Sequence, residues 1–194
     1  MSIEYVNKME WVGLLHNASL RYVFDRISTI APKKPSKNIV KAIIEEYFAA
    51  AGIREAVPKF NPKVTMESAI AALLKKNKVT KGGAEALGKL ALLLSKPPKL
   101  ATLTKQVTKL ELESIRILDG ADLLTFQAAA AVARHSAQLW APKKDGGDGQ
   151  PTNYPQFSID WGEVLAADCI GFFEGGPLGA AVFSLADALV QLDR

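Results

Sequence analysis

The sequence predicts an all-α fold, with a single helical domain over residues 1–194 and about seven to eight helices. Apolar residues recur three and four positions apart in successive segments, as they do on one face of a helix. No segment has the sustained alternation of apolar and polar residues that is typical of strands. With 48% hydrophobic and 23% charged residues, a chain of 194 residues can bury one sizeable core.

Two helices are predicted near the N-terminus. Asn7 and Glu10 have the spacing of a capping pair, and they begin a helix over about residues 8–28. Its apolar face consists of Val12, His16, Leu20, Val23 and Ile27. The second helix follows Ser36, has the clearest apolar stripe in the chain and stops at Gly52.

Four more helices are predicted in the middle of the chain. Thr65 caps the first of them, and Gly82–Gly83 separates it from the next, which ends at Pro97–Pro98. The other two cover residues 100–118 and the stretch from there to Trp140. The last of these contains an alanine run that allows neighbouring helices to pack closely.

A flexible loop rich in glycine, proline and aspartate is predicted at about 141–157, before a C-terminal helical hairpin at about 160–192. Asp160 and Glu163 form a capping pair at the start of the hairpin. We expect its two helices to be separated by a break at Gly175–Gly176–Pro177.

Glycines of the hairpin recur at helical spacing, at Gly171, Gly175 and Gly179. A four-residue interval puts all three on one helical face, which should lie against another helix of the protein. The N-terminal helix is the expected neighbour, because Gly13 allows a close approach and His16 can pair with the Asp168 carboxylate.

Basic residues gather in the middle of the chain. The net charge is +4, but residues 33–109 have a net charge of +11 and residues 110–194 one of −7. This asymmetry indicates either that the basic part binds an anionic partner or that the two halves attract each other within one fold. Because nearly all the bases are lysines, we expect an acidic protein or a non-specific polyanion as partner, without specific nucleic-acid recognition. The predicted contact surface consists of Lys75, Lys76, Lys78 and Lys81.

Location and cofactors are predicted from what the sequence lacks. No secretory leader is recognisable, so the expected location is cytoplasmic. The acids Asp168, Glu174 and Asp187 interrupt the C-terminal apolar run, which argues against a transmembrane span. Cys169 is the only cysteine, so an internal disulfide and a four-thiolate metal site are excluded. No cofactor and no metal are expected.

Three residues are candidates for a catalytic site: His16, Asp168 and Cys169. His16 lies on an apolar helix face, where a buried histidine with satisfied ring nitrogens is the favoured interpretation and a general base or metal ligand the alternative. A buried Asp168 needs a partner. Cys169 and Ser136 lack any local nucleophile signature and are interpreted as small core residues.

Three short pieces, residues 7–17, 136–140 and 167–171, resemble a pattern in some uncharacterised bacterial proteins. In that group the N-terminal piece reads Val-Gly-x-x-His-Asn, and the C-terminal piece reads Ala-Asp-x-x-Gly before a tail rich in glycine and alanine. Here the tail departs from the pattern at Phe172–Phe173 and Pro177. The resemblance implies a bacterial protein and adds no mechanism.

Three hypotheses about function follow. The first is a non-enzymatic helical interaction module with a lysine-rich surface for an acidic partner. The second is an enzyme or metal-dependent protein with a pocket that contains His16 and Asp168. The third is a membrane-active protein that inserts its glycine-rich C-terminal hairpin. The first is favoured, and the oligomeric state stays open.

Overall fold

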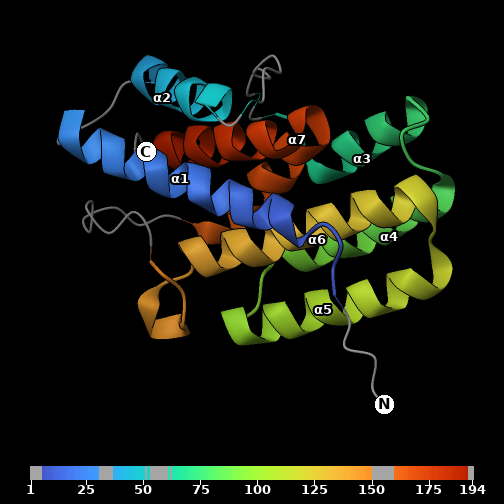
Figure 1. Cartoon of the computed structure of the whole chain (residues 1–194). Coiled ribbons are helices and arrows are strands. Elements are labelled where there is room, and N and C mark those ends of the chain that lie inside the picture. Colours follow the sequence, from blue (N-terminus) through green and yellow to red (C-terminus); the bar gives the residue numbers. More distant parts are fainter. Residues whose placement is uncertain are drawn as a thin grey trace.

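A computed structural model of the chain confirms the all-α class (Figure 1). It describes residues 6–30, 37–50, 52, 61, 63–149 and 160–191. In this part of the chain the α-helices are α1 (Glu10–Ile30), α2 (Lys37–Ala50), α3 (Met66–Lys75), α4 (Lys81–Leu94), α5 (Leu100–Ile117), α6 (Gly120–Trp140) and α7 (Trp161–Gln191), with a short 3-10 helix η1 (Lys143–Asp145).

Helix α6 lies at the centre of the bundle and contacts α1, α4, α5 and α7. Its alanine run, residues 128–131, is fully buried, because the small side chains let the neighbouring helices come close. Helix α1 crosses over α6, and α2 covers α1 and α7 on the side opposite α5 (Figure 1).

Gly13 marks the closest approach of α1 to α6. A Cβ atom at this position would lie 2.6 Å from the carbonyl oxygen of Ala131. The expectation that Gly13 allows α1 to approach the C-terminal hairpin is therefore wrong. The glycine instead serves the contact with the alanine run of α6, and α1 reaches α7 through other residues.

Helix α7 folds back on itself at Gly175–Gly176. Both residues have non-helical backbone angles, and Gly176 has a φ of 57°, which favours glycine. At the open end, Gln191 Oε1 accepts a hydrogen bond from the amide of Asp160 at 2.6 Å. Residues 31 positions apart can meet in this way only in a hairpin, and the bend lies where the sequence predicts it.

The glycine face of the hairpin has a different neighbour from the one expected. A Cβ atom on Gly171 would lie 2.2 Å from the carbonyl oxygen of Gly179, so the two halves of α7 pack against each other at these glycines. Gly175 is part of the bend. The bend brings together two positions that a straight helix would separate by about 12 Å.

One stretch of the described chain, Trp161–Ala188, is apolar and long enough to cross a membrane by length and composition, with a mean hydropathy of 1.4. In this structure it is the bent α7, and it packs against α1, α2, α3, α4 and α6. Its apolar side chains form much of the core, including Leu165, Leu178 and Phe183.

The boundary between α3 and α4 differs from the prediction. Thr65 caps α3 as expected, in a capping box with Ser68. Gly82–Gly83, however, lies in the first turn of α4 rather than between the helices, and Thr80 is the N-cap. Position 83 needs a glycine because a Cβ atom there would lie 2.6 Å from Cγ of Asp122 on α6.

The described part of the predicted flexible loop is ordered by hydrogen bonds. After η1, the amides of Asp148 and Gly149 donate to the carbonyls of Gln138 and Ala141 at 2.8 and 2.9 Å. Arg21 on α1 pairs with Asp148 at 2.6 Å. Residues 142–149 thus form a turn docked on α6 and α1, and residues 150–157 of the predicted loop lie outside the described residues.

Candidate functional sites

His16 on α1 and Asp168 on α7 meet in the core, as predicted. His16 Nε2 lies 3.3 Å from Asp168 Oδ2, although out of line for a hydrogen bond, and both side chains are 0% exposed. His16 Nδ1 lies 2.9 Å from Asn17 Oδ1, and Asn17 Nδ2 donates to the His135 carbonyl. Since the amide oxygen can only accept, Nδ1 is the donor. Nε2 has no hydrogen-bond partner among the described residues, so only one of the two ring nitrogens is satisfied as the sequence predicts.

The surroundings of this pair favour a structural role. Ser136 donates its hydroxyl hydrogen to the same oxygen, Asp168 Oδ2. A catalytic serine would instead bind the imidazole. Cys169 is fully buried, and burial raises the pKa of its thiol far above the ordinary value. A general base or nucleophile has to contact substrate, and these side chains have no exposed surface.

Metal binding is the alternative chemistry predicted for His16 and Asp168. Among the residues that the structure describes, no group of three His, Cys, Asp or Glu side chains is placed to hold a metal ion. The pair itself contacts Asn17 and Ser136, which complete a polar cluster between α1, α6 and α7.

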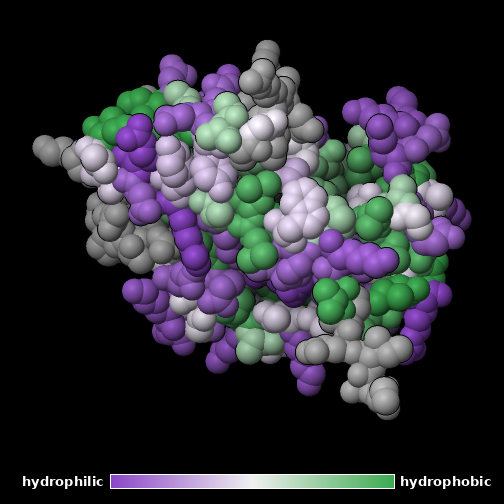
Figure 2. Space-filling view, in the orientation of Figure 1, coloured by the Kyte–Doolittle hydropathy of each residue, from purple (hydrophilic) through white to green (hydrophobic). Residues whose placement is uncertain are grey.

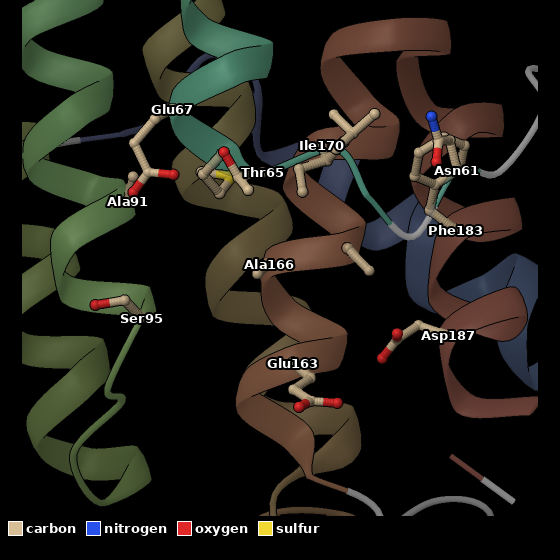
Figure 3. A pocket seen from close by; sticks show the side chains of 13 residues that line it. Asn61, Thr65, Glu67, Ala91, Ser95, Glu163, Ala166, Ile170, Phe183 and Asp187 are labelled. Atoms are coloured by element: carbon tan, nitrogen blue, oxygen red, sulfur yellow. The ribbon is translucent and has the colours of Figure 1, made fainter. Parts of the chain in front are cut away.

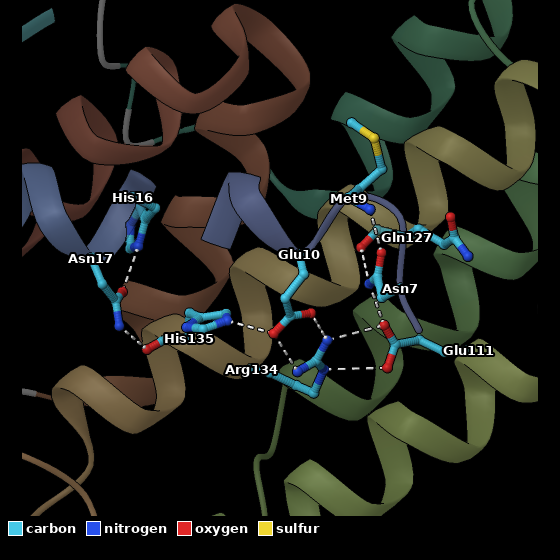
Figure 4. A network of polar contacts seen from close by, with 9 residues as sticks. All are labelled: Asn7, Met9, Glu10, His16, Asn17, Glu111, Gln127, Arg134 and His135. Carbon is cyan, nitrogen blue, oxygen red and sulfur yellow. Dashed lines mark hydrogen bonds and ion pairs between the residues drawn. The ribbon is translucent and has the colours of Figure 1, made fainter. Parts of the chain in front are cut away.

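A second polar cluster, which the sequence analysis did not predict, fastens the start of α1 to α5 and α6 (Figure 4). Arg134 on α6 pairs with Glu10 and, through Nε, with Glu111 Oε2 at 3.2 Å. His135 Nε2 lies 2.6 Å from Glu10 Oε1. Asn7 donates to Glu111 and to the Gln127 carbonyl. Asn7 Oδ1 accepts a hydrogen bond from the Met9 amide at 2.7 Å, so the Asn7 half of the predicted capping pair is present. The Glu10 carboxylate instead binds Arg134 and His135.

The two carboxylates of this cluster are affected in opposite directions. Burial raises the pKa of Glu111, because the pairing with Arg134 and Asn7 only partly offsets the desolvation. Burial would also raise the pKa of Glu10, but the hydrogen bonds and charges of Arg134 and His135 outweigh it and lower the pKa. Ionised Glu10 therefore stabilises the folded state more than protonated Glu10 does.

We expect the stabilisation by Glu10 to disappear in acid. Because its pKa is lowered in the folded state, the stabilisation is complete above the unfolded pKa of about 4.3 and is lost as the pH falls through the folded value. Glu10→Gln should thus unfold more easily than the wild type by about 1 kcal/mol at pH 7, since solvent screens this half-buried group. Urea unfolding at pH 7 and at pH 3 measures the difference. A gap of equal size at both pH values would contradict this account.

The predicted anion-binding lysines form one exposed turn between α3 and α4, which we call the lysine turn: Lys75, Lys76, Lys78 and Lys81. Asn77, with a φ of 52°, follows the C-cap Lys76 of α3. The amide of Lys78 donates to the Leu73 carbonyl and that of Asn77 to the Leu74 carbonyl, which is a Schellman motif. The lysine turn is therefore an ordered element.

Asp122 on α6 fixes the other end of the lysine turn. Its Oδ1 accepts a hydrogen bond from the amide of Thr80 at 2.9 Å, and its Oδ2 accepts one from the Thr80 hydroxyl. Val79 is buried beneath the turn. In Figure 2 the end of α3 and the turn after it form a hydrophilic projection at the upper right, beside apolar surface.

An apolar groove runs along α3 and α4 beside the lysine turn, with a volume of about 480 Å³. Its lining includes Ala71, Leu74, Gly88 and Leu92, all exposed. Leu92 is 77% exposed, whereas Leu87, Leu90 and Leu94 on the same helix are buried. In the sequence, the groove is indicated only by Leu92, an apolar residue outside the buried apolar stripe of α4.

The far end of this groove is acidic. There it shares Glu67, Ala91 and Ser95 with a cavity of about 340 Å³ between α3, α4 and α7, which is also lined by Glu163 and Asp187 (Figure 3). The amide at the start of α3 and the Thr65 side chain lower the pKa of Glu67, so that it is ionised at neutral pH. Asp187 accepts a hydrogen bond from Gln191 at 2.7 Å.

The fold and these surfaces define an all-α bundle with a sealed polar core and an open groove with charges of opposite sign at its two ends. Comparison with protein-family models, with curated proteins and with solved structures found no match for this chain. The resemblance to uncharacterised bacterial proteins and the cytoplasmic location stay predictions.

Proposed function

We propose that this protein is a non-enzymatic interaction module whose lysine turn binds the carboxylates of an acidic protein partner. The observation that carries the proposal is the position of the turn, at one end of an open apolar groove. Side chains of the partner that neighbour its carboxylates can bury apolar surface on Leu74 and Leu92, which are 40% and 77% exposed.

Two further features support this proposal. The turn is held by the Schellman motif and by Asp122, so that little conformational entropy is lost when a partner binds. Lys81 lies 4.0 Å from Glu85, a long and exposed pair that costs little to exchange for another carboxylate. By contrast, the alternative enzyme site at His16 and Asp168 has no exposed surface.

We expect fluorescein-labelled poly-glutamate of about 20 residues to bind weakly, and high salt to abolish the binding, because about 1 M salt reduces the screening length to about 3 Å. Replacing Lys75, Lys76 and Lys78 by alanine should weaken binding about tenfold or more. Fluorescence anisotropy at low micromolar protein measures both effects.

A matched variant controls for net charge. Lys96, Lys99 and Lys105 are exposed lysines outside the lysine turn, and their replacement by alanine removes the same charge. If both triple variants weaken poly-glutamate binding equally, the binding depends on the net charge of the whole protein, and the proposed site is overturned.

A further inference from the structure

We infer that the carboxylates bound by the lysine turn belong to a second copy of this chain, paired about a two-fold axis through the groove between α3 and α4. The inference rests on the proposed function and names the source of the carboxylates: Glu67, which lines the far end of the groove, and Glu163 in the adjacent cavity.

The charges along the groove support this pairing. Helices α3 and α4 are antiparallel neighbours joined by the lysine turn, so all four of its lysines lie at one end of the groove. Glu67 lies at the other end, where the exposed Lys96 follows Ser95. An interface with two-fold symmetry has to be complementary to itself. Rotation about an axis through the middle reverses the groove, and each lysine turn then faces the acidic end of the other copy.

The apolar lining of the groove is the surface that such a pair would bury. It combines small residues with a projecting apolar one: a Cβ atom on Gly88 would meet nothing within 4 Å, whereas Leu92 is one turn further along α4 and 77% exposed. Under two-fold symmetry, Leu92 of each copy can fill the space over Ala71 and Gly88 of the other. Exposed apolar patches of this kind mark interaction sites.

The size of the face limits the affinity. Helices of 10 and 14 residues are about 15 and 21 Å long, which makes a face smaller than the roughly 800 Å² per partner of a standard interface. We therefore expect a reversible dimer with a dissociation constant in the micromolar range or weaker, which dilution separates.

Sedimentation velocity of the full chain from about 1 μM to about 1 mM tests this expectation, because that range spans such dissociation constants. The sedimentation coefficient should rise with concentration. Leu92→Glu should weaken the dimer at least about tenfold. Leu14→Glu is the matched control, because Leu14 is also an exposed helical leucine, on α1 and outside the groove. A monomer at every concentration, or equal effects of the two variants, would overturn the inference.

Charge exchange tests the orientation. One variant, Lys75→Glu with Lys78→Glu, has acids at both ends of the groove, and the other, Glu67→Lys with Glu163→Lys, has bases at both ends. Each alone should dimerise more weakly than the wild type, and their mixture should form a heterodimer with opposite charges at both ends. Circular dichroism confirms that both are folded. A mixture that associates no better than its components would overturn the two-fold arrangement.

The outcomes separate this inference from the proposed function. If the chain stays monomeric while poly-glutamate binding still depends on Lys75, Lys76 and Lys78, the second copy is wrong and the acidic partner is another protein. If neither dimerisation nor poly-glutamate binding depends on the lysine turn, the proposed function fails as well.

Discussion

His16→Ala is expected to lower the free energy of unfolding by about 2–5 kcal/mol. The substitution leaves Asp168 buried at 0% exposure with Ser136 as its only remaining described partner, and it opens a cavity between α1, α6 and α7. Urea or guanidinium unfolding measures the change. Asn17 loses its contact with the ring as well, while its bond to the His135 carbonyl remains.

Leu14→Ala is the matched control, because Leu14 lies two residues away on the same helix and is 56% exposed. Its effect should stay within about 0.5 kcal/mol. Combining His16→Ala with Asp168→Ala should cost less than the two single losses added together, since each removes the partner of the other. Additive losses, or an unchanged midpoint in His16→Ala, would contradict a coupled pair in the core.

Gly171→Val should destabilise the protein by about 3 kcal/mol or more. A Cβ atom there would lie 2.2 Å from the Gly179 carbonyl oxygen and 2.8 Å from the Phe183 Cβ atom, and the first of these is backbone that cannot rotate away. Relief requires the two halves of α7 to separate, which exposes core residues on both. Thermal and chemical unfolding, followed by circular dichroism, measure the loss.

Gly82→Ala provides the comparison. Gly82 is also a helical glycine, but a Cβ atom there would meet its nearest neighbour at 3.7 Å, which is ordinary contact. Alanine in a helix is favoured over glycine by about 0.5–1 kcal/mol, so this variant should be as stable as the wild type or slightly more stable. If Gly171→Val were tolerated equally well, the close packing within α7 would be refuted.

Helix type and position were largely predictable from the sequence because they depend on neighbours along the chain. Thr65 caps α3, Asp160 accepts hydrogen bonds from the first amides of α7, and the bend follows Gly175. The local pattern was misleading at Gly82–Gly83, because a glycine pair is typical of a break between helices, whereas here it lies in the first turn of α4. The carboxylate of Asp122, 39 residues after Gly83, explains the second glycine, and this contact appears only in the folded chain.

Of the two buried polar clusters, the one around His16 and Asp168 could be predicted from the sequence. Burial of His16 follows from its place on an apolar stripe, and its contact with Asp168 follows from the need to pair two buried polar groups. The cluster of Glu10, Glu111 and Arg134 left no such signal, because charged residues at helical spacing normally face solvent. Glu111 became buried because α5 packs against α6 beside Arg134.

By itself, the sequence determined the all-α class, most helix boundaries and the gathering of lysines between α3 and α4, because these depend on residue type and local spacing. Only the tertiary structure decided that Gly171 meets Gly179, that Gly13 faces α6 and that an acidic cavity ends the groove. Each of these depends on the directions in which helices cross, and packing of the whole core sets those directions. A charge pattern along the chain becomes a charged surface only after that packing has placed its residues side by side.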